Sequence, residues 1–287
     1  MLSSYFKIAL RSLGKQKLYA LINILGLAIG IAICMMAYLY AKYEFSYDQW
    51  YANSEQVYRV NGIFNMDGEV DEVPLTPYPL AGALAQELPE VASSAKLDEG
   101  WRELLIESAS QRNYCQQYAR VDSSFFQDFS LPFVASDPKR ALHQPDRTVV
   151  SYAFAQQYFG STDVLGKSIK INNTREYIIS GVLAKPKGPS HFSFDLYLPT
   201  QARESMENAW MNMFNYYTYV RLHPGTDPAA FEQKLSSLLQ DNLVALGQQQ
   251  GLTTSEVEEF TSAIKMPAIP VEHQFIVMEQ DPELVRF

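Results

Sequence analysis

The feature that most constrains this chain is an uncharged run of about 24 residues near its beginning, Leu18 to Ala41. An α-helix rises about 1.5 Å per residue, so this run would extend about 36 Å, enough to cross a hydrocarbon layer of about 30 Å. A charged residue stands at each end of the run, Lys17 and Lys42. The pattern therefore predicts one transmembrane helix over residues 18–41.

The residues before this run predict its orientation. Four of them are basic and none is acidic: Lys7, Arg11, Lys15 and Lys17. Basic segments stay on the cytoplasmic side of a membrane, so we expect residues 1–17 inside and residues 42–287 outside. Apolar residues interleave with the basic ones, as in an amphipathic helix on the inner membrane surface, although a basic leader that only sets orientation is the alternative.

A cleaved signal peptide also has a basic start and an apolar core. Its core is shorter, about 7–15 residues, and it ends in small residues at a cleavage site. Here bulky aromatic side chains follow the apolar run, from Tyr38 to Trp50. We therefore expect the helix to remain as an anchor.

Small and polar residues recur within the run at intervals of three and four: Asn23, Gly26, Gly30, Cys34 and Ala37. This spacing places them on one face of a helix, and the two glycines form a GxxxG pattern. Such a face lets two helices approach closely in lipid, and an asparagine can form a hydrogen bond across the contact. We predict a packing face for other membrane helices, while the general abundance of glycine in membrane helices is the alternative.

Charge divides the chain into two parts. Residues 1–17 carry +4, whereas the remainder carries 19 basic and 32 acidic residues, a net charge of −13. A strongly acidic outer region does not suit nucleic acid, which requires a basic surface. The two cysteines, Cys34 and Cys115, lie too far apart in the expected topology to form a disulfide, and no cluster at metal-ligand spacing occurs. We expect no metal and no cofactor.

The outer region alternates between strand and helix patterns. Strands are predicted at 56–64, 91–97, 103–109, 114–121, 148–151, 168–172, 176–183 and 216–222, with a hairpin turn at Asp67-Gly68. Helices are predicted at 79–88, 123–129 and 152–159, and from Pro228 onward behind an Asp227 cap. The order predicts an α+β fold with two subdomains, the second a β-rich insertion over approximately residues 99–212.

No catalytic constellation stands out in this pattern. Gly160 to Ser168 resembles a phosphate-binding Walker loop, but it has one residue too many between its glycines and leads from a helix to a strand. Ser190, His191 and Asp195 are close only in sequence. We expect the four histidines, at positions 143, 191, 223 and 273, to be surface or turn residues.

Several stretches, taken in order, resemble the N-terminal part of ABC-transporter permeases of the MacB/FtsX type, from the first membrane helix through the MacB-like periplasmic core domain. They are FKIALRSLGKQKLYALINILGLAIGIA, EFSYDQWYANSEQVYRV, SFFQDFSLPFVASDPKRAL, VVSYAFAQQYFGSTDVLGKSI, ISGVLAKPKGPSHFSFD and YVRLHPGTDPAAFEQKL. The series covers nearly Tyr5 to Leu239.

The resemblance implies a permease subunit in the bacterial inner membrane, with a separate cytoplasmic ATPase as its partner. It implies that ATP-driven movement of the membrane helices is transmitted to the periplasmic domain, for export or extraction of a substrate, and that this subunit has no active site of its own. Further expected partners are a second permease copy or other membrane helices, a periplasmic adaptor or substrate, and the lipid bilayer.

A complete permease of this type has further membrane helices after its core domain, and the sequence contains none, so a fragment or a truncated product is expected. A single-pass sensor, binding or accessory protein is the competing function. A membrane-anchored hydrolase is a third, supported only by scattered Ser, His and acidic residues.

Overall fold

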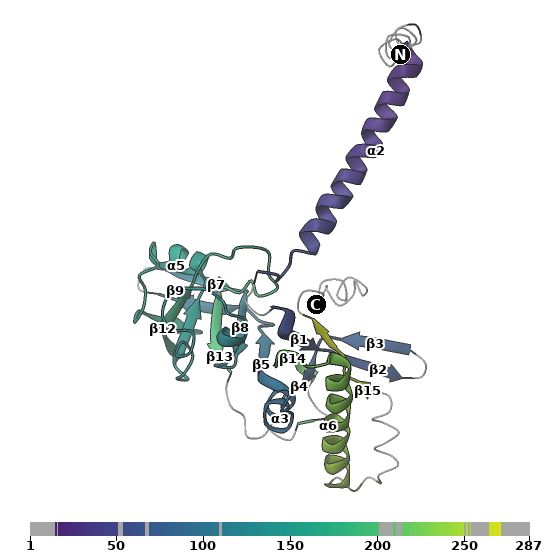
Figure 1. The fold of residues 1–287 in the computed structure, drawn as a ribbon. Coiled ribbons are helices and arrows are strands. Elements are labelled where there is room, and N and C mark those ends of the chain that lie inside the picture. The colour runs from purple at the N-terminus through teal and green to yellow at the C-terminus, as the bar shows by residue number, and fades with distance from the viewer. Residues whose placement is uncertain are drawn as a thin grey trace. The chain divides into compact units, whose positions relative to one another are not determined.

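The computed structural model describes residues 15, 17–50, 54–66, 69–108, 111–200, 209–210, 214–249, 251, 253 and 264–270. The chain forms two compact units, Met1–Ser46 and Tyr47–Phe287. The first contains helix α2 (Lys17–Glu44), which includes the whole of the predicted span (Figure 1). Its 28 residues correspond to a length of about 42 Å.

The second unit is built on a thirteen-stranded sheet. Across the sheet its strands run β16 (Ala268–Pro270), β1 (Val57–Val60), β14 (Phe214–Leu222), β5 (Val91–Glu99), β8 (Tyr118–Val121), β13 (Leu196–Pro199), β10 (Arg147–Val150), β12 (Arg175–Leu183), β11 (Ser168–Ile171), β6 (Leu104–Glu107) and β7 (Arg112–Cys115). The remaining two, β4 (Thr76–Pro77) and β9 (Phe133–Ala135), pair with β14 and β12. A separate three-stranded sheet consists of β15 (Ile264–Lys265), β2 (Gly62–Met66) and β3 (Glu69–Val73).

Most neighbouring strands are antiparallel, while β10 pairs in parallel with β12, and β13 with β8. The strands of residues 104–199 occupy one continuous half of the large sheet, beyond β5. Mixed pairing together with separate helices makes this an α+β fold, as the sequence predicts. The boundaries at 99 and 212 of an inserted subdomain remain a prediction.

The described part of the second unit contains five helices: η1 (Ser54–Gln56), α3 (Leu80–Glu87), α4 (Phe125–Asp128), α5 (Tyr152–Phe159) and α6 (Pro228–Gln249). Two of the five, α5 and α6, begin at a side-chain cap. The Ser151 hydroxyl accepts a hydrogen bond from the Phe154 N–H at 2.9 Å, and Gly160 ends α5 in the left-handed conformation. For α6, Asp227 Oδ1 accepts a bond from the Ala229 N–H at 3.1 Å. The predicted cap is confirmed.

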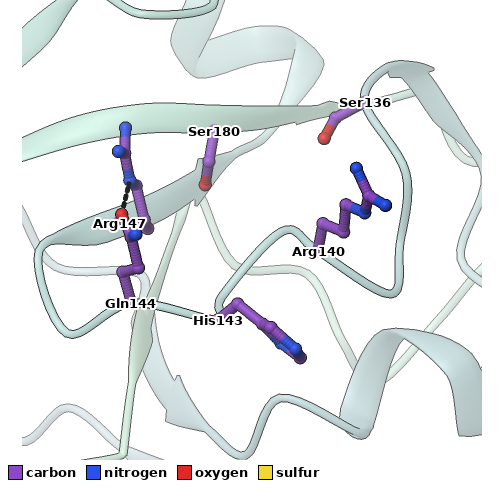
Figure 2. Close-up of a pocket in the computed structure, with 6 residues that line it drawn as sticks. All are labelled: Ser136, Arg140, His143, Gln144, Arg147 and Ser180. Atoms are coloured by element: carbon purple, nitrogen blue, oxygen red, sulfur yellow. Dashed lines mark hydrogen bonds between the residues drawn. The ribbon is translucent and has the colours of Figure 1, made fainter.

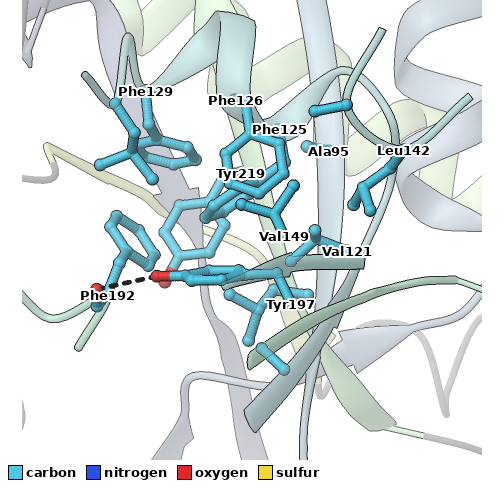
Figure 3. Close-up of a cluster of buried hydrophobic side chains, with 14 of the residues drawn as sticks. Ala95, Val121, Phe125, Phe126, Phe129, Leu142, Val149, Phe192, Tyr197 and Tyr219 are labelled. Atoms are coloured by element: carbon cyan, nitrogen blue, oxygen red, sulfur yellow. Dashed lines mark hydrogen bonds between the residues drawn. The ribbon is translucent and has the colours of Figure 1, made fainter. Parts of the chain in front are cut away.

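Three large clusters of buried apolar side chains lie in the second unit, beside a small one of Tyr78 and Tyr216. The first is largely aromatic and surrounds α4 (Figure 3): Phe125, Phe126, Phe129, Phe192, Tyr197 and Tyr219 are all buried in it. The second joins α3 and α6 to β1 and β14 through residues such as Leu84, Val220 and Leu235. The third packs α5 against β10–β13, and includes Phe154 and Val182.

Two strand predictions are wrong in their extent. The run predicted over 114–121 is two strands, because the chain turns at Gln116, whose carbonyl oxygen accepts a bond from the Tyr118 N–H at 3.2 Å. β7 then pairs with β6, whereas β8 pairs with β5 and β13. The run predicted over 56–64 breaks at Asn61, so that β1 belongs to the large sheet and β2 to the small one.

Other predicted elements are confirmed with small shifts of their ends. The hairpin of β2 and β3 has the expected register, Met66 opposite Glu69, while the turn residues 67 and 68 lie outside the described residues. Residues 1–14, 52–53, 254–263 and 271–287 also lie outside them, and so do the predictions made there, which include the amphipathic segment. Five strands were not predicted: β4, β9, β13, β15 and β16. The strand β3 was implied only by the predicted hairpin turn.

Candidate functional site

The predicted packing residues all lie in α2: Asn23, Gly26, Gly30, Cys34 and Ala37. Each is exposed within this chain. Because the segment is helical throughout, their spacing of three and four residues places them along one side of it. A Cβ atom added at Gly26 or Gly30 would have no neighbouring atom within 4 Å among the described residues. Contacts within the described part of the chain therefore do not explain these glycines.

Of the predicted topology-setting residues, Lys15 and Lys17 are described and both are exposed, in helical conformation. Lys7 and Arg11 lie outside the described residues. Among the residues that the structure describes, one helix, Lys17–Glu44, is long and apolar enough to cross a membrane, with a mean hydropathy of 2.4 in its most apolar window.

The segment that follows α2 is fastened to the loop between β12 and β13 by what we term the Asp48 cluster, formed by Tyr47, Asp48, Trp50, Gly188, Pro189 and His191. Asp48 is completely buried. Its carboxylate accepts a bond from the His191 backbone N–H at 3.2 Å, and its second oxygen contacts His191 Nδ1. Because a carboxylate only accepts hydrogen bonds, the facing imidazole nitrogen carries the hydrogen.

Backbone and ring contacts complete the Asp48 cluster. The Pro189 carbonyl oxygen accepts bonds from the Asp48 N–H at 3.2 Å and from Trp50 Nε1 at 3.1 Å. The Tyr47 and His191 rings lie 5.0 Å apart. A Cβ atom at Gly188 would approach the Trp50 ring to 3.0 Å, so glycine permits this close approach. The cluster holds the start of the second unit by several independent contacts.

A buried arginine forms a second polar centre, on β1. Arg59 is 2% exposed, and its Nε donates to Asn61 Oδ1 at 2.8 Å. Asn61 in turn donates to Glu72 Oε1 at 2.7 Å, across to the small sheet. Burial, the largest influence, lowers the pKa of Arg59, while neighbouring tyrosines and Glu72 act in the opposite direction. Burial and the nearby Glu99 raise the pKa of Tyr217 to about 12, which keeps its hydroxyl protonated.

These contacts connect strands rather than assemble reactive groups. Arg59 lies opposite Tyr219 on β14 and Ile269 on β16, between the two strands that flank β1. Through Asn61 and Glu72 it is also linked to β3 of the small sheet. Burial raises the pKa of the Cys115 thiol to about 12, so it stays protonated and unreactive near neutral pH. In the described part of the chain no group of three or more His, Cys, Asp or Glu could hold a metal ion.

His191 lies at a bend in the loop between β12 and β13, in line with a turn residue, but its ring is not on the surface, because it is largely buried against Asp48. Its acidic neighbour in sequence, Asp195, instead accepts a bond from the Ser151 hydroxyl at 2.9 Å. His143 and His223 are exposed, as expected, and His273 lies outside the described residues. The loop from Gly160 to Ser168 connects α5 to β11, which confirms the helix-to-strand turn.

Sequence reasoning missed Asp48 and Arg59. Asp48 gave no signal, since its partner is 143 positions away. Arg59 did give one, because it takes the same strand face as the buried Val57, an inward position where an arginine is unusual.

Taken together, the geometry defines a class of protein: a helix with the dimensions of a membrane span, followed by an α+β domain whose first residues are pinned by the Asp48 cluster. Residues 20–238 match the model of the MacB-like periplasmic core domain family. The chain belongs to this family, whose domain occurs in permeases of ABC transporters.

Solved structures also resemble the chain. A domain of a protein described as a permease, from Porphyromonas gingivalis, has 20% identity and a TM-score of 0.60, covering 77% of this chain and 91% of that one. The periplasmic region of MacB from Actinobacillus actinomycetemcomitans has 13% identity and a TM-score of 0.48, covering 77% and 93%. The extracellular domain of the ABC-type transporter YknZ from Gram-positive bacteria has 12% identity and a TM-score of 0.42, covering 73% and 98%.

At these identities the first likeness concerns the fold alone, and it agrees with the family assignment. Among curated proteins, none matches the chain.

Proposed function

We propose that this chain acts as part of a permease subunit of a MacB/FtsX-type ABC transporter, which couples ATP hydrolysis on a cytoplasmic partner to movement of a periplasmic domain. The observation that supports this best is the extent of the family match, which begins at residue 20, inside α2, and continues to residue 238. The match therefore includes the junction of helix and domain, where movement would have to be transmitted.

The proposed role of the Asp48 cluster is to hold in place the first residues of the second unit, which follow α2 in the sequence. Only residues 45–47 separate the end of α2 at Glu44 from the buried Asp48. A displacement of the helix end would therefore reach Asp48 through a very short connector, and the hydrogen bonds to Pro189 and His191 would pass it to the loop before β13. Export, or extraction of a molecule from the outer leaflet, is the work this movement would do.

In this proposal the chain lies in the bacterial inner membrane, with residues 1–17 cytoplasmic and the core domain periplasmic. Its partners are an ABC ATPase subunit, a second permease copy or other membrane helices, and a periplasmic adaptor or substrate. The chain contributes no catalytic residues, and ATP is hydrolysed on the partner subunit.

The proposal is tested by isolating the native protein from solubilised membranes with an antibody against the core domain, and identifying the proteins that accompany it. We expect an ABC ATPase subunit to accompany the chain in stoichiometric amount. The same isolation with an unrelated antibody should recover neither protein. A preparation that lacks any ATPase, under detergents that preserve other ABC transporters, would contradict the proposal and favour a single-pass sensor or accessory protein.

The packing face of α2 leads to a prediction about association. Gly26→Leu adds bulk where close helix approach needs a small residue, so it should weaken association with membrane partners while leaving insertion intact. Asn23→Leu should have a smaller effect, since a hydrogen bond between membrane helices is worth about 0.6 kcal/mol on average. A membrane dimerisation reporter, or co-isolation as above, measures both.

Ala28→Leu is the matched control for Gly26→Leu, because it adds similar bulk to α2 away from the packing face. Equal association of Gly26→Leu and Ala28→Leu would remove the packing face from the proposal.

A further inference from the structure

A cavity lined by residues of polar types lies beside the loop that leads from β9 to β10 (Figure 2). Its volume is about 570 Å³, within the usual range for small-molecule sites, and its lining residues are Ser136, Arg140, His143, Gln144, Arg147 and Ser180. Five of these six come from the loop and the first residue of β10, and Ser180 comes from β12. The cavity plays no part in the Asp48 cluster or the packing face.

The loop that carries the lining residues is anchored at its middle. Ala141 and Leu142 are buried in the aromatic core. The Ser180 hydroxyl shares its single hydrogen between the Ala141 and Thr148 carbonyl oxygens, the second at 3.0 Å. The Arg140 N–H donates to the Asp137 carbonyl oxygen at 2.9 Å. The exposed side chains on either side of the buried pair are thus presented from a fixed backbone.

The lining is basic, which is unusual for this chain. It contains two arginines and a histidine and no acidic residue, whereas the sequence after residue 17 carries a net charge of −13, with 19 basic against 32 acidic residues. Two acidic residues lie in the loop outside the lining. Asp146 Oδ1 lies 3.7 Å from Arg147 Nε, and Asp137 Oδ1 accepts a bond from the Lys139 backbone N–H at 3.0 Å. The cavity is a local positive site in an acidic domain.

Some donors of the cavity are already used within the protein, and others are not. Arg147 Nε is committed to Gln144 Oε1 at 2.9 Å, which holds that side chain in place. Arg140 makes no side-chain hydrogen bond or ion pair with the described residues, and Figure 2 shows its guanidinium extended toward Ser136. Ser136 has a φ of +100°, a backbone conformation rare for serine, of a kind that concentrates at functional sites. The Ser180 hydrogen is already donated, so Ser180 forms part of the wall.

We propose that this cavity binds a phosphate group. The guanidinium fork of Arg140 matches phosphate oxygens in pairs, and the Ser136 hydroxyl, toward which that guanidinium extends in Figure 2, adds a further donor. Arg147 and His143 add positive charge and polarity to the rest of the lining. Its source is either a small phosphate compound or the headgroup of a phospholipid. The binding site does not depend on a permease role for the chain.

Binding is tested with the full chain in neutral detergent at low ionic strength, where surface charges are least screened. Inorganic phosphate and dihexanoyl phosphatidylglycerol are titrated separately, and binding is followed by ³¹P NMR. Arg140→Gln should weaken binding by about tenfold or more, because it removes a charge-assisted contact. Arg102→Gln is the matched control, since Arg102 is an equally charged, exposed residue outside the cavity.

Saturable binding of inorganic phosphate, lost in Arg140→Gln and kept in Arg102→Gln, would support a small phosphate compound as the ligand. The same pattern for the phosphatidylglycerol alone would support a lipid headgroup. Failure of the unaltered chain to bind either probe, or equal weakening by the two substitutions, would overturn the proposal.

Discussion

Replacing Asp48 by asparagine should lower the free energy of unfolding of the second unit by about 2–3 kcal/mol. The buried carboxylate of Asp48 accepts bonds from the His191 backbone and ring, and an asparagine offers one oxygen in place of two. One of the two His191 donors would then face the amide nitrogen of the asparagine, which does not accept a hydrogen bond. Asparagine keeps the size of the side chain and tolerates the positive φ of 55° at this position, so backbone strain adds little.

Urea unfolding in detergent, followed by tryptophan fluorescence, measures this effect, and Trp50 reports from within the Asp48 cluster itself. For a unit of this size the midpoint of thermal unfolding should fall by about 4–12 °C. Asp163→Asn is the control, since Asp163 is exposed, with no side-chain hydrogen bond among the described residues. Equal stability of the two variants would mean that the Asp48 cluster does not hold the segment after α2.

A double-mutant cycle separates the Asp48–His191 contact from other effects of each substitution. We expect Asp48→Asn and His191→Ala together to cost less than the sum of the two, because each alone already removes the same contact. Additive costs would indicate that the two residues act independently. This cycle also identifies the variants best suited to a transport assay, since they weaken the Asp48 cluster without altering the membrane helix.

Replacing Phe125 by alanine should cost about 3–5 kcal/mol of stability, the largest effect expected from a single substitution in this chain. Phe125 is completely buried at the centre of the aromatic core (Figure 3). Its ring centroid lies 4.7 Å from that of Phe129, 5.2 Å from Phe192 and 5.5 Å from Phe126. Alanine would leave a cavity among three rings that the surrounding sheet holds in place.

Phe125→Leu is the milder companion, expected to remain folded with a smaller loss, in case the alanine variant does not fold. Trp101→Ala is the control for removal of an aromatic ring, because Trp101 is 69% exposed and should change stability by less than about 0.5 kcal/mol. Urea midpoints of the three variants give the comparison. A loss at Phe125 no greater than that at Trp101 would contradict the description of the core.

Helices were predictable from the sequence because their signals are local. The uncharged run gave α2, and Asp227 followed by Pro228 gave the start of α6. This cap depends on residues within a few positions of one another. The α+β class followed from the alternation of such helices with strand patterns.

Strand partners could not be predicted in the same way. A β-rich run does not reveal where its partner changes, so the turn at Gln116 and the break at Asn61 were missed. Asn61 illustrates the cause. Its backbone N–H donates to the Pro267 carbonyl oxygen at 3.1 Å, a contact between residues more than 200 positions apart. Only the folded sheet brings them together.

The candidate site was accessible to sequence reasoning only in its membrane part. The small residues of α2 form a pattern with helical period, whereas Asp48 and His191 are ordinary residues until the fold joins them across 143 positions. The basic cavity is an intermediate case. Arg140, His143 and Arg147 are near one another in the sequence, whereas Ser180 comes from another strand. Local charge patterns are visible in a sequence, but cavities are not.

The central claim, that α2 crosses the membrane and holds the core domain on the outer side, is tested most directly by labelling single cysteines in intact cells with a permeabilised outer membrane. Cys34 and Cys115 are first replaced by alanine, and a cysteine is then introduced as Trp101→Cys in the domain or as Ser3→Cys before the helix. With a membrane-impermeant maleimide we expect Trp101→Cys to be labelled at once and Ser3→Cys only after cell lysis. Labelling of Ser3→Cys in intact cells while Trp101→Cys stays protected would contradict the claim.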